Sequence, residues 1–235
     1  MPKKLIKELK KLSNKKQAES LKKFFKTEKG QYGEGDIFLG VKVPIQRKIC
    51  SKYDFELKDI QQLLNSKIHE HRLCALFSLI SKYKKANKIE RGRIFNFYLK
   101  NAKKINNWDL VDLSAPNIVG DYLLKNTQII KILEKLAHSK NLWEKRIAIV
   151  STSQFIREGE HLDEVLKISE ILLKDKHDLI HKAVGWMLRE LGKKDLLALE
   201  CFIRMYYKKM PRTTLRYAIE RFPEKKRKEY LKGKW

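Results

Sequence analysis

The sequence has little of what stabilises small secreted proteins or anchors membrane proteins. Its 235 residues include only three cysteines, which lie far apart and form no CxxC pair. We therefore expect neither a disulfide framework nor a thiolate zinc site, and a reducing compartment such as the cytoplasm fits the chain. No apolar run approaches the roughly 18 residues of a transmembrane helix, and the start, MPKKLIKEL, is too polar for a signal peptide.

Acidic residues are scarce relative to basic ones. Lys and Arg number 53 against 28 Asp and Glu, which gives a formal net charge of +25. A surplus of this size favours a polyanionic partner such as nucleic acid, bound largely by neutralising its phosphates. The lysine pairs near the N-terminus surround the helices instead of leaving one broad apolar face, so we do not expect a membrane-surface helix. With 43% hydrophobic residues the chain is globular.

Proline and glycine are also rare, which suits a helical chain. There are five prolines and ten glycines, and four of the glycines fall between about Glu28 and Val43, the longest predicted loop. Elsewhere apolar residues recur with the helical period, and no alternating strand pattern appears. Three such series are Leu5, Ile6, Leu9 and Leu12, then Leu73, Leu76, Phe77 and Ile80, and Ile180, Val184, Leu188 and Leu191. The sequence therefore predicts an all-α fold.

An internal period of roughly 37 residues refines this prediction. Steps of this length from Glu70 reach Asn107, Glu144 and His181, and each of these anchors is expected to open a helix. Two helices per repeat are typical of a HEAT-like solenoid, an α–α superhelix whose concave face we expect to be basic. We expect one such domain over 1–235, with N-terminal helices and the glycine-containing loop at about 1–43, repeats at about 44–222 and a basic tail at about 223–235.

The segment Asn107–Asp112, NWDLVD, contains two carboxylates and an indole in this basic chain. Trp108 and Asp112 are four residues apart and share a helix face. At about 100° per residue, Leu110 and Leu113 point to the other side. A carboxylate that faces a polyanion repels it, so its presence there would need an explanation other than binding affinity. The alternative is an ion pair with a neighbouring lysine or a contact at a helix end.

A second tryptophan, Trp186, falls on the same repeat position as Asp112, two periods later. It lies in a stripe with Lys182, Arg189 and Lys193, apart from the apolar face of its helix. An indole among cations suits contact with a nucleic-acid backbone and packing on a sugar or base. It equally suits a tryptophan that shields a helix junction, beside lysines that face solvent.

Other candidate sites are weaker. Arg146 suits either a structural role or phosphate binding. The pairs His69/His71 and His177/His181 lack a third ligand at a recognisable spacing, so we expect no metal site. The glycine-rich stretch lacks the GK[ST] ending of a phosphate-binding P-loop.

A carboxylate beside DNA would have a purpose if positive charge developed near it. Cleavage of an N-glycosidic bond builds such charge on the deoxyribose, and a fixed carboxylate stabilises it and orients the attacking water. Purines alkylated at N3 or N7 are already cationic and leave readily. An enzyme for them could therefore be selective without a tight base pocket.

The chain resembles the AlkD-type DNA alkylation repair glycosylases of the HEAT-like repeat superfamily. The resemblance rests on FLGVKVPIQR from Phe38, NWDLVD from Asn107, WEKRIAI from Trp143 and HKAVGWMLRE from His181. It implies that the catalytic aspartate is Asp112, that the two cleft tryptophans are Trp108 and Trp186, and that the phosphate-facing arginine is Arg146.

The resemblance also implies an activity and its partners. We expect a monofunctional glycosylase that removes N3- and N7-alkylpurines from double-stranded DNA during base excision repair, with no cofactor. Arg146, Lys182, Arg189 and Lys193 would bind the nucleic acid, and the protein would act as a cytoplasmic, nucleoid-associated monomer with no obligate protein partner. The alternatives are a non-catalytic HEAT-repeat protein that binds bent, branched or damaged DNA, and a helical scaffold for an acidic protein.

Overall fold

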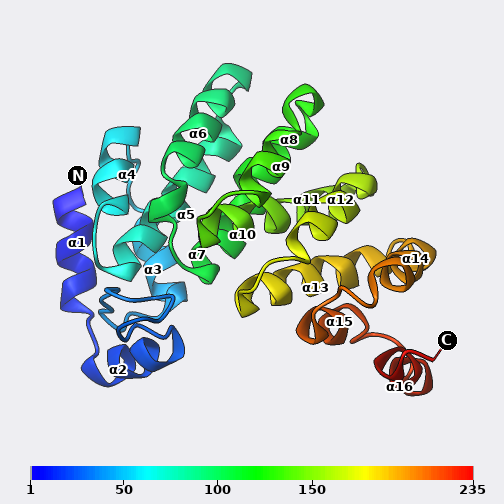
Figure 1. Ribbon diagram of the computed structural model, residues 1–235. Coiled ribbons are helices and arrows are strands. Elements are labelled where there is room, and N and C mark those ends of the chain that lie inside the picture. The colour runs from blue at the N-terminus through cyan, green and yellow to red at the C-terminus, as the bar shows by residue number, and fades with distance from the viewer. Residues whose placement is uncertain (1, 235) are drawn as a thin grey trace. The chain divides into compact units, whose positions relative to one another are not determined.

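The computed structural model describes residues 2–234, and most of them are helical (Figure 1). Within this range, β pairing is confined to an isolated bridge between Ile37 and Ile68. The prediction of an all-α fold of successive helices is therefore confirmed. No helix among these residues is long and apolar enough to cross a membrane. The chain divides into two compact units, Met1–Ser114 and Ala115–Trp235.

The first unit consists of helices packed around α5, whose consecutive residues His69–Leu76 are all buried. They are α1 (Pro2–Lys11), α2 (Lys15–Phe24), α3 (Val43–Cys50), α4 (Leu57–Leu64), α5 (His69–Lys85), α6 (Lys88–Lys100) and most of α7 (Trp108–Ala115), with a 3-10 turn at Ala102–Lys104. Helix α5 contacts α3, α4 and α6, and α1 contacts α3 and α4. Leu5 and Leu9 of α1 and Ile60 of α4 are fully buried in this packing, as expected for amphipathic helices.

The second unit is built around a long helix, α13. Its elements are a π-helical turn at Pro116–Gly120, α8 (Asp121–Leu124), a 3-10 turn at Thr127–Ile129, α9 (Ile132–Ala137), α10 (Leu142–Ser151), α11 (Ser153–Glu158), α12 (Leu162–Leu172), α13 (Asp178–Gly192), α14 (Leu196–Tyr206), α15 (Arg212–Ala218) and α16 (Glu224–Lys232). Helix α13 contacts α10, α12, α14 and α15. The basic C-terminal segment predicted at about 223–235 thus contains a helix, and its Tyr230 is buried.

The predicted period of roughly 37 residues matches the helix boundaries. Glu70 is the second residue of α5, Asn107 directly precedes α7, and Glu144 and His181 lie in the first turns of α10 and α13. One further helix, α6, follows before Asn107, and two follow before each later anchor: α8 and α9, then α11 and α12. A helix at each anchor is confirmed, and at least one more helix follows it in each repeat.

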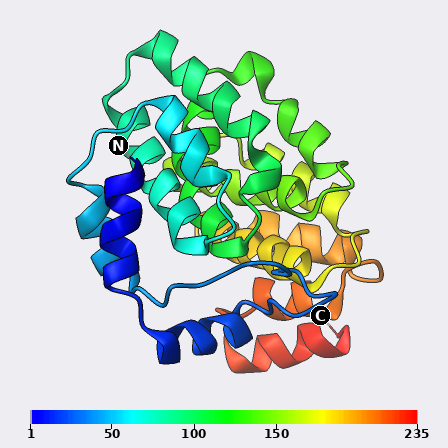
Figure 2. The same cartoon turned by 90° about the vertical axis from the view of Figure 1, so that its left-hand side faces the viewer.

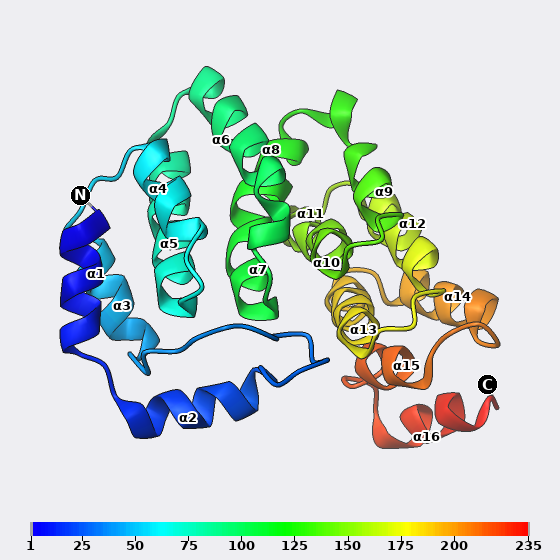
Figure 3. The ribbon, with the colours of Figure 1, turned by 60° about the vertical axis from the view of Figure 1, so that its left-hand side comes forward.

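The predicted glycine-rich loop joins α2 to α3 and runs beside α2 (Figures 2 and 3). Gly40 has a φ of +80°, and a Cβ there would lie 2.2 Å from the carbonyl oxygen of Asn14, the N-cap of α2. Only glycine combines this backbone conformation with such a close approach. The loop is therefore held against the start of α2.

Candidate active site

Helix α7 presents the Trp108–Asp112 pair as the sequence predicted. It begins at Trp108, where the side-chain oxygen of Asn107 accepts a hydrogen bond from the Trp108 backbone N–H (2.8 Å). Leu110 and Val111 are completely buried, whereas Trp108 and Asp112 are partly exposed. Leu113, which was expected to lie with Leu110 on the other side, is partly exposed as well. The indole and the carboxylate thus lie on the less buried side of one short helix.

The Trp108 ring belongs to an aromatic cluster on the first unit. It stacks on Phe25, with ring centroids 5.2 Å apart, and meets Phe24 edge to face at 5.8 Å. Phe25 stacks in turn on Phe38. Because Phe25 and Phe38 are buried and Phe24 is 62% exposed, the cluster extends from the core to the surface beside Trp108.

Asp112 lies close to a buried hydroxyl network. Burial raises the pKa of Tyr98, and the negative charge of Asp112 raises it further, against a hydrogen bond to Ser114 that lowers it. The Tyr98 and Ser114 hydroxyl oxygens are 2.8 Å apart. Tyr98 therefore stays a neutral phenol next to the carboxylate.

The helix changes geometry one turn after Asp112, where α7 ends at Ala115. Pro116 has no N–H, so the carbonyl of Asp112, four residues earlier, cannot receive the usual α-helical hydrogen bond from it. The chain forms a π-helical turn from Pro116 to Gly120 at this point. Such insertions occur frequently at functional sites.

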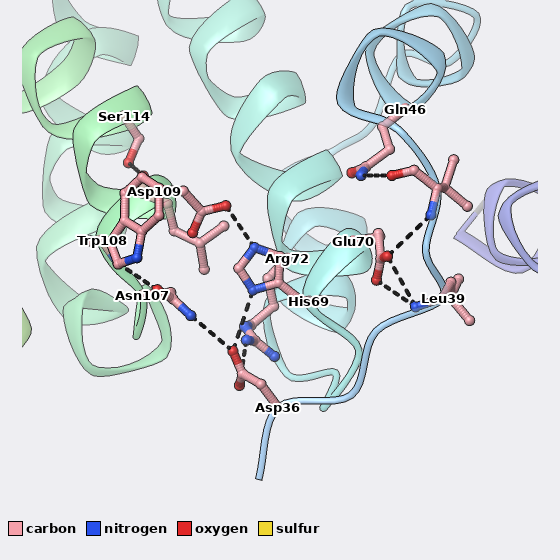
Figure 4. A network of polar contacts seen from close by, with 12 residues as sticks. Asp36, Leu39, Gln46, His69, Glu70, Arg72, Asn107, Trp108, Asp109 and Ser114 are labelled. Atoms are coloured by element: carbon pink, nitrogen blue, oxygen red, sulfur yellow. Dashed lines mark hydrogen bonds and ion pairs between the residues drawn. The ribbon is translucent and has the colours of Figure 1, made fainter. Parts of the chain in front are cut away.

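A buried charge network lies behind the first turn of α7 (Figure 4). His69, the first residue of α5, contacts Asp109 through Nε2 (2.7 Å) and Asp36 of the glycine-rich loop through Nδ1 (3.3 Å). Arg72 pairs with the other oxygen of Asp36 at 2.7 Å. Burial alone would lower the pKa of His69, but the two carboxylates outweigh it and raise the pKa to about 9. Burial opposes ionisation of Asp36 as well, yet His69 and Arg72 lower its pKa.

A third carboxylate, that of Glu70, fixes the loop next to this network. Glu70 is 1% exposed, and its side chain accepts hydrogen bonds from the backbone N–H groups of Leu39, Gly40 and Val41 (Figure 4). The side-chain amide of Gln46 donates to the Val41 carbonyl at 2.7 Å. Residues 36–41 are therefore tied to the start of α5 on both sides of Phe38.

The remaining predicted site residues belong to the second unit. Arg146 of α10 is 5% exposed, and its Nη1 donates to the carbonyl of Leu179 in the first turn of α13 (2.6 Å). Trp186 is partly exposed on α13. The contact with Leu179 places Arg146 next to the helix that carries Trp186.

The predicted basic stripe on α13 is present, and each of its cations has an acidic partner. Lys182 pairs with Asp178 at 2.7 Å. Arg189 pairs with Glu190 and Glu220, and Lys193 pairs with Glu190 as well. A phosphate that binds here has to compete with these carboxylates.

Comparison with known proteins identifies the family of the chain. A family model described as DNA alkylation repair enzyme matches residues 5–222. The chain belongs to this family. A solved structure, the "Predicted DNA alkylation repair enzyme from Enterococcus faecalis", has a TM-score of 0.71 and 15% sequence identity, over 90% of this chain and 97% of that one. At this identity the similarity establishes the fold. No curated protein sequence matches the chain.

Family membership confirms the resemblance predicted from the four sequence segments. It associates the chain with the repair of alkylated DNA. The assignments of Asp112, Trp108, Trp186 and Arg146 within that role stay predictions, as does DNA binding by the stripe on α13.

Sequence reasoning missed the network around His69, which it considered only as half of a His69/His71 metal pair and set aside for lack of a third ligand. Among residues 2–234, no three His, Cys, Asp or Glu side chains are grouped to hold a metal ion. His69 instead bridges two carboxylates, and His71 contacts the Ser66 hydroxyl. A signal was available, because Asp109 lies one residue after Trp108 and a carboxylate that folding partly buries needs a cationic partner.

Proposed function

We propose that this family member is a monofunctional DNA glycosylase that hydrolyses the N-glycosidic bond of N3- or N7-alkylated purines in duplex DNA, as a step of base excision repair. The observation that carries the proposal is the partly exposed Asp112 carboxylate four residues after the partly exposed Trp108 indole on one helix, α7. That pair, in a protein of the DNA alkylation repair family, suits chemistry at a sugar that becomes positively charged.

In the proposed reaction, the bond between C1′ and the base nitrogen breaks and its electron pair neutralises the cationic purine. The deoxyribose is left as an oxocarbenium-like cation, which the negative charge of Asp112 stabilises. Water adds to C1′ and gives up one proton, with Asp112 orienting the water. Trp108 and Trp186 would pack against the deoxyribose, and Arg146 would bind a phosphate. No metal or nucleotide cofactor takes part, so base release should persist in EDTA.

The positive charge of the protein supports DNA as its substrate. Residues 2–24, which contain α1 and α2, have nine lysines and two glutamates. Such a segment attracts phosphates at long range and favours association with DNA. The same charge favours the second candidate function, a non-catalytic protein that binds bent, branched or damaged DNA, which gives Asp112 no chemical role.

Base release from duplex DNA with a single 7-methylguanine separates these two functions. The wild type should free the base. Asp112→Asn should lower the single-turnover rate by about 10²–10³-fold, because the neutral amide no longer stabilises the cation. Asp121→Asn is the matched control, since Asp121 is a partly buried aspartate that pairs with Lys125.

Each outcome has a distinct meaning. A wild type that binds the duplex and releases no base disproves the glycosylase and leaves the binding function. Equal rates for wild type and Asp112→Asn would show that Asp112 is misassigned. Under the proposal, Asp112→Asn still binds DNA and Asp121→Asn keeps the wild-type rate.

A further inference from the structure

His69 joins three segments that are distant in the sequence. It belongs to α5, and its side chain is 3% exposed. One ring nitrogen contacts Asp36 on the glycine-rich loop, and the other contacts Asp109 in the first turn of α7 (Figure 4). Carboxylates accept hydrogen bonds, so His69 satisfies both partners only when both of its ring nitrogens carry a proton.

The charges around His69 balance within the first unit. The charged groups that face it are Asp36 from the loop, Asp109 from α7 and Arg72 from its own helix. Two carboxylates therefore meet two cations. Phe38 stacks on the imidazole at 4.7 Å, and Phe25 lies 5.1 Å from it. A neutral side chain at position 69 would leave the partly buried Asp109 carboxylate without its cationic partner, while Asp36 would keep Arg72.

Both carboxylates that contact His69, Asp36 and Asp109, connect it to the first turn of α7. Asp109 is the residue next to Trp108, and His69 holds it directly. Asp36 also accepts from the Asn107 side-chain amide at 3.4 Å, and Asn107 in turn binds the Trp108 backbone N–H. A rotation of α7 about its axis would break contacts of both carboxylates, and Phe25, which also touches the His69 ring, covers the Trp108 ring.

We propose that His69 is a positioning residue for α7: by donating to Asp36 and Asp109 it fixes the first turn of this helix, and with it the orientation of Trp108 and Asp112 for base excision. The catalytic part of this inference rests on the proposed function. His69 acts through Asp109 and Asn107, and its removal should displace the carboxylate from its working position. A displacement on the order of 1 Å can lower a rate by about 10²-fold.

The variants are His69→Gln and, as a matched control, His71→Gln. His71 lies two residues further along α5, is equally buried at 3% exposure, and contacts Ser66 instead of α7. With a 7-methylguanine duplex, His69→Gln should lower the single-turnover rate by about 10–10²-fold with DNA affinity little changed. His71→Gln should destabilise the fold and keep the wild-type rate. A purely structural role of His69 predicts the same behaviour for both variants.

A double-mutant cycle tests whether His69 acts through Asp109. Asp109→Asn should reduce the rate by a similar factor. The double variant should lose little beyond either single one, because both changes break the same contact. If the rate losses of the two single variants add fully in the double variant, His69 does not act through Asp109.

A fluorine NMR spectrum of protein labelled with 5-fluorotryptophan tests the positioning without any activity. Trp108→Phe assigns the Trp108 signal. His69→Gln should shift or broaden this signal and leave the signals of the other three tryptophans unchanged, whereas His71→Gln should leave all four signals unchanged. If the wild type releases no base, the proposed function is refuted. The positioning role of His69 is then still tested by the Trp108 signal, which does not depend on activity. An unchanged Trp108 signal in folded His69→Gln overturns the inference.

Discussion

The two helices that carry the predicted cleft tryptophans are held in different ways. Helix α7 has eight residues, and its first turn is fixed by the buried Asp36 and His69 and by the partly buried Asp109. Helix α13 has fifteen residues and buries an apolar face on its neighbours. Arg146 donates to the carbonyl of Leu179 in its first turn, and the charges of its own stripe pair near the surface. The comparison therefore contrasts a helix whose first turn is held mainly by charges with one that is held mainly by packing.

Length explains part of this difference. A helix of eight residues is unstable in isolation because few hydrogen bonds offset its nucleation, so α7 depends on contacts at its ends. Helix α13 has buried residues at regular spacing, among them Ile180, Val184 and Leu188, which suffice to hold it. The two helices should consequently respond to different perturbations: α7 to the loss of a buried charge, and α13 to a change of volume.

The largest effect is expected from Asp36→Ala. Removal of this carboxylate leaves Arg72 and His69, both buried, without a shared counter-ion, and breaking a buried pair in this way costs about 3–5 kcal/mol. Urea denaturation should show this loss. Asp54→Ala is the control, because Asp54 is 95% exposed in its pair with Lys82 and should change stability by less than about 0.5 kcal/mol. Equal effects of the two substitutions would show that the buried network contributes nothing to stability.

A pH series should show the contribution of His69 itself. Its folded-state pKa of about 9 lies above the unfolded value of 6.5, so its stabilisation is complete below about pH 6.5 and declines as the pH rises to about 9. The difference corresponds to about 3 kcal/mol. The free energy of unfolding of the wild type should fall over this range.

Two variants identify the titrating group in that series. His69→Gln should lose the decline between pH 6.5 and 9. His71→Gln should keep it, because burial and Arg72 lower the pKa of His71 to about 4, outside this range. If the decline survives in His69→Gln, another group titrates and the imidazolium is not the source.

Helix α13 should be sensitive to volume instead. A Cβ on Gly185 would lie 2.5 Å from Cβ of Tyr217 and 2.6 Å from the carbonyl oxygen of Thr214, so Gly185→Ala forces α13 and α15 apart and should cost about 1–3 kcal/mol. Gly192→Ala on the same helix meets Cδ2 of Leu199, the end of a flexible side chain that can move, and should cost less. Thermal unfolding measures both. A larger loss for Gly192→Ala would contradict the tight packing at Gly185.

The sequence predicted what depends on local spacing. The period from Glu70 located the starts of the main helices, and the four-residue spacing put Trp108 and Asp112 on one side of α7. It could not predict the partners of His69, because Asp36 and Asp109 are 33 and 40 residues away and only the folded chain brings them together. It also could not show that each cation of the α13 stripe has an acidic partner, since Glu220 reaches Arg189 from beyond the helix.

The smallest effects on stability are expected on the α13 stripe, where DNA affinity is the informative measurement. Lys182→Gln removes a pair whose side chains are 41% and 58% exposed, so it should change stability by less than about 1 kcal/mol. If Lys182 binds a phosphate, the substitution should also reduce the slope of log affinity against log salt by about 1, equally for damaged and undamaged duplex. Asp178→Asn should do the reverse and strengthen binding, because the phosphate no longer competes with the carboxylate. An unchanged salt slope in Lys182→Gln would place the stripe outside the DNA-binding surface, and Trp186 would then be a helix-junction tryptophan beside solvated cations.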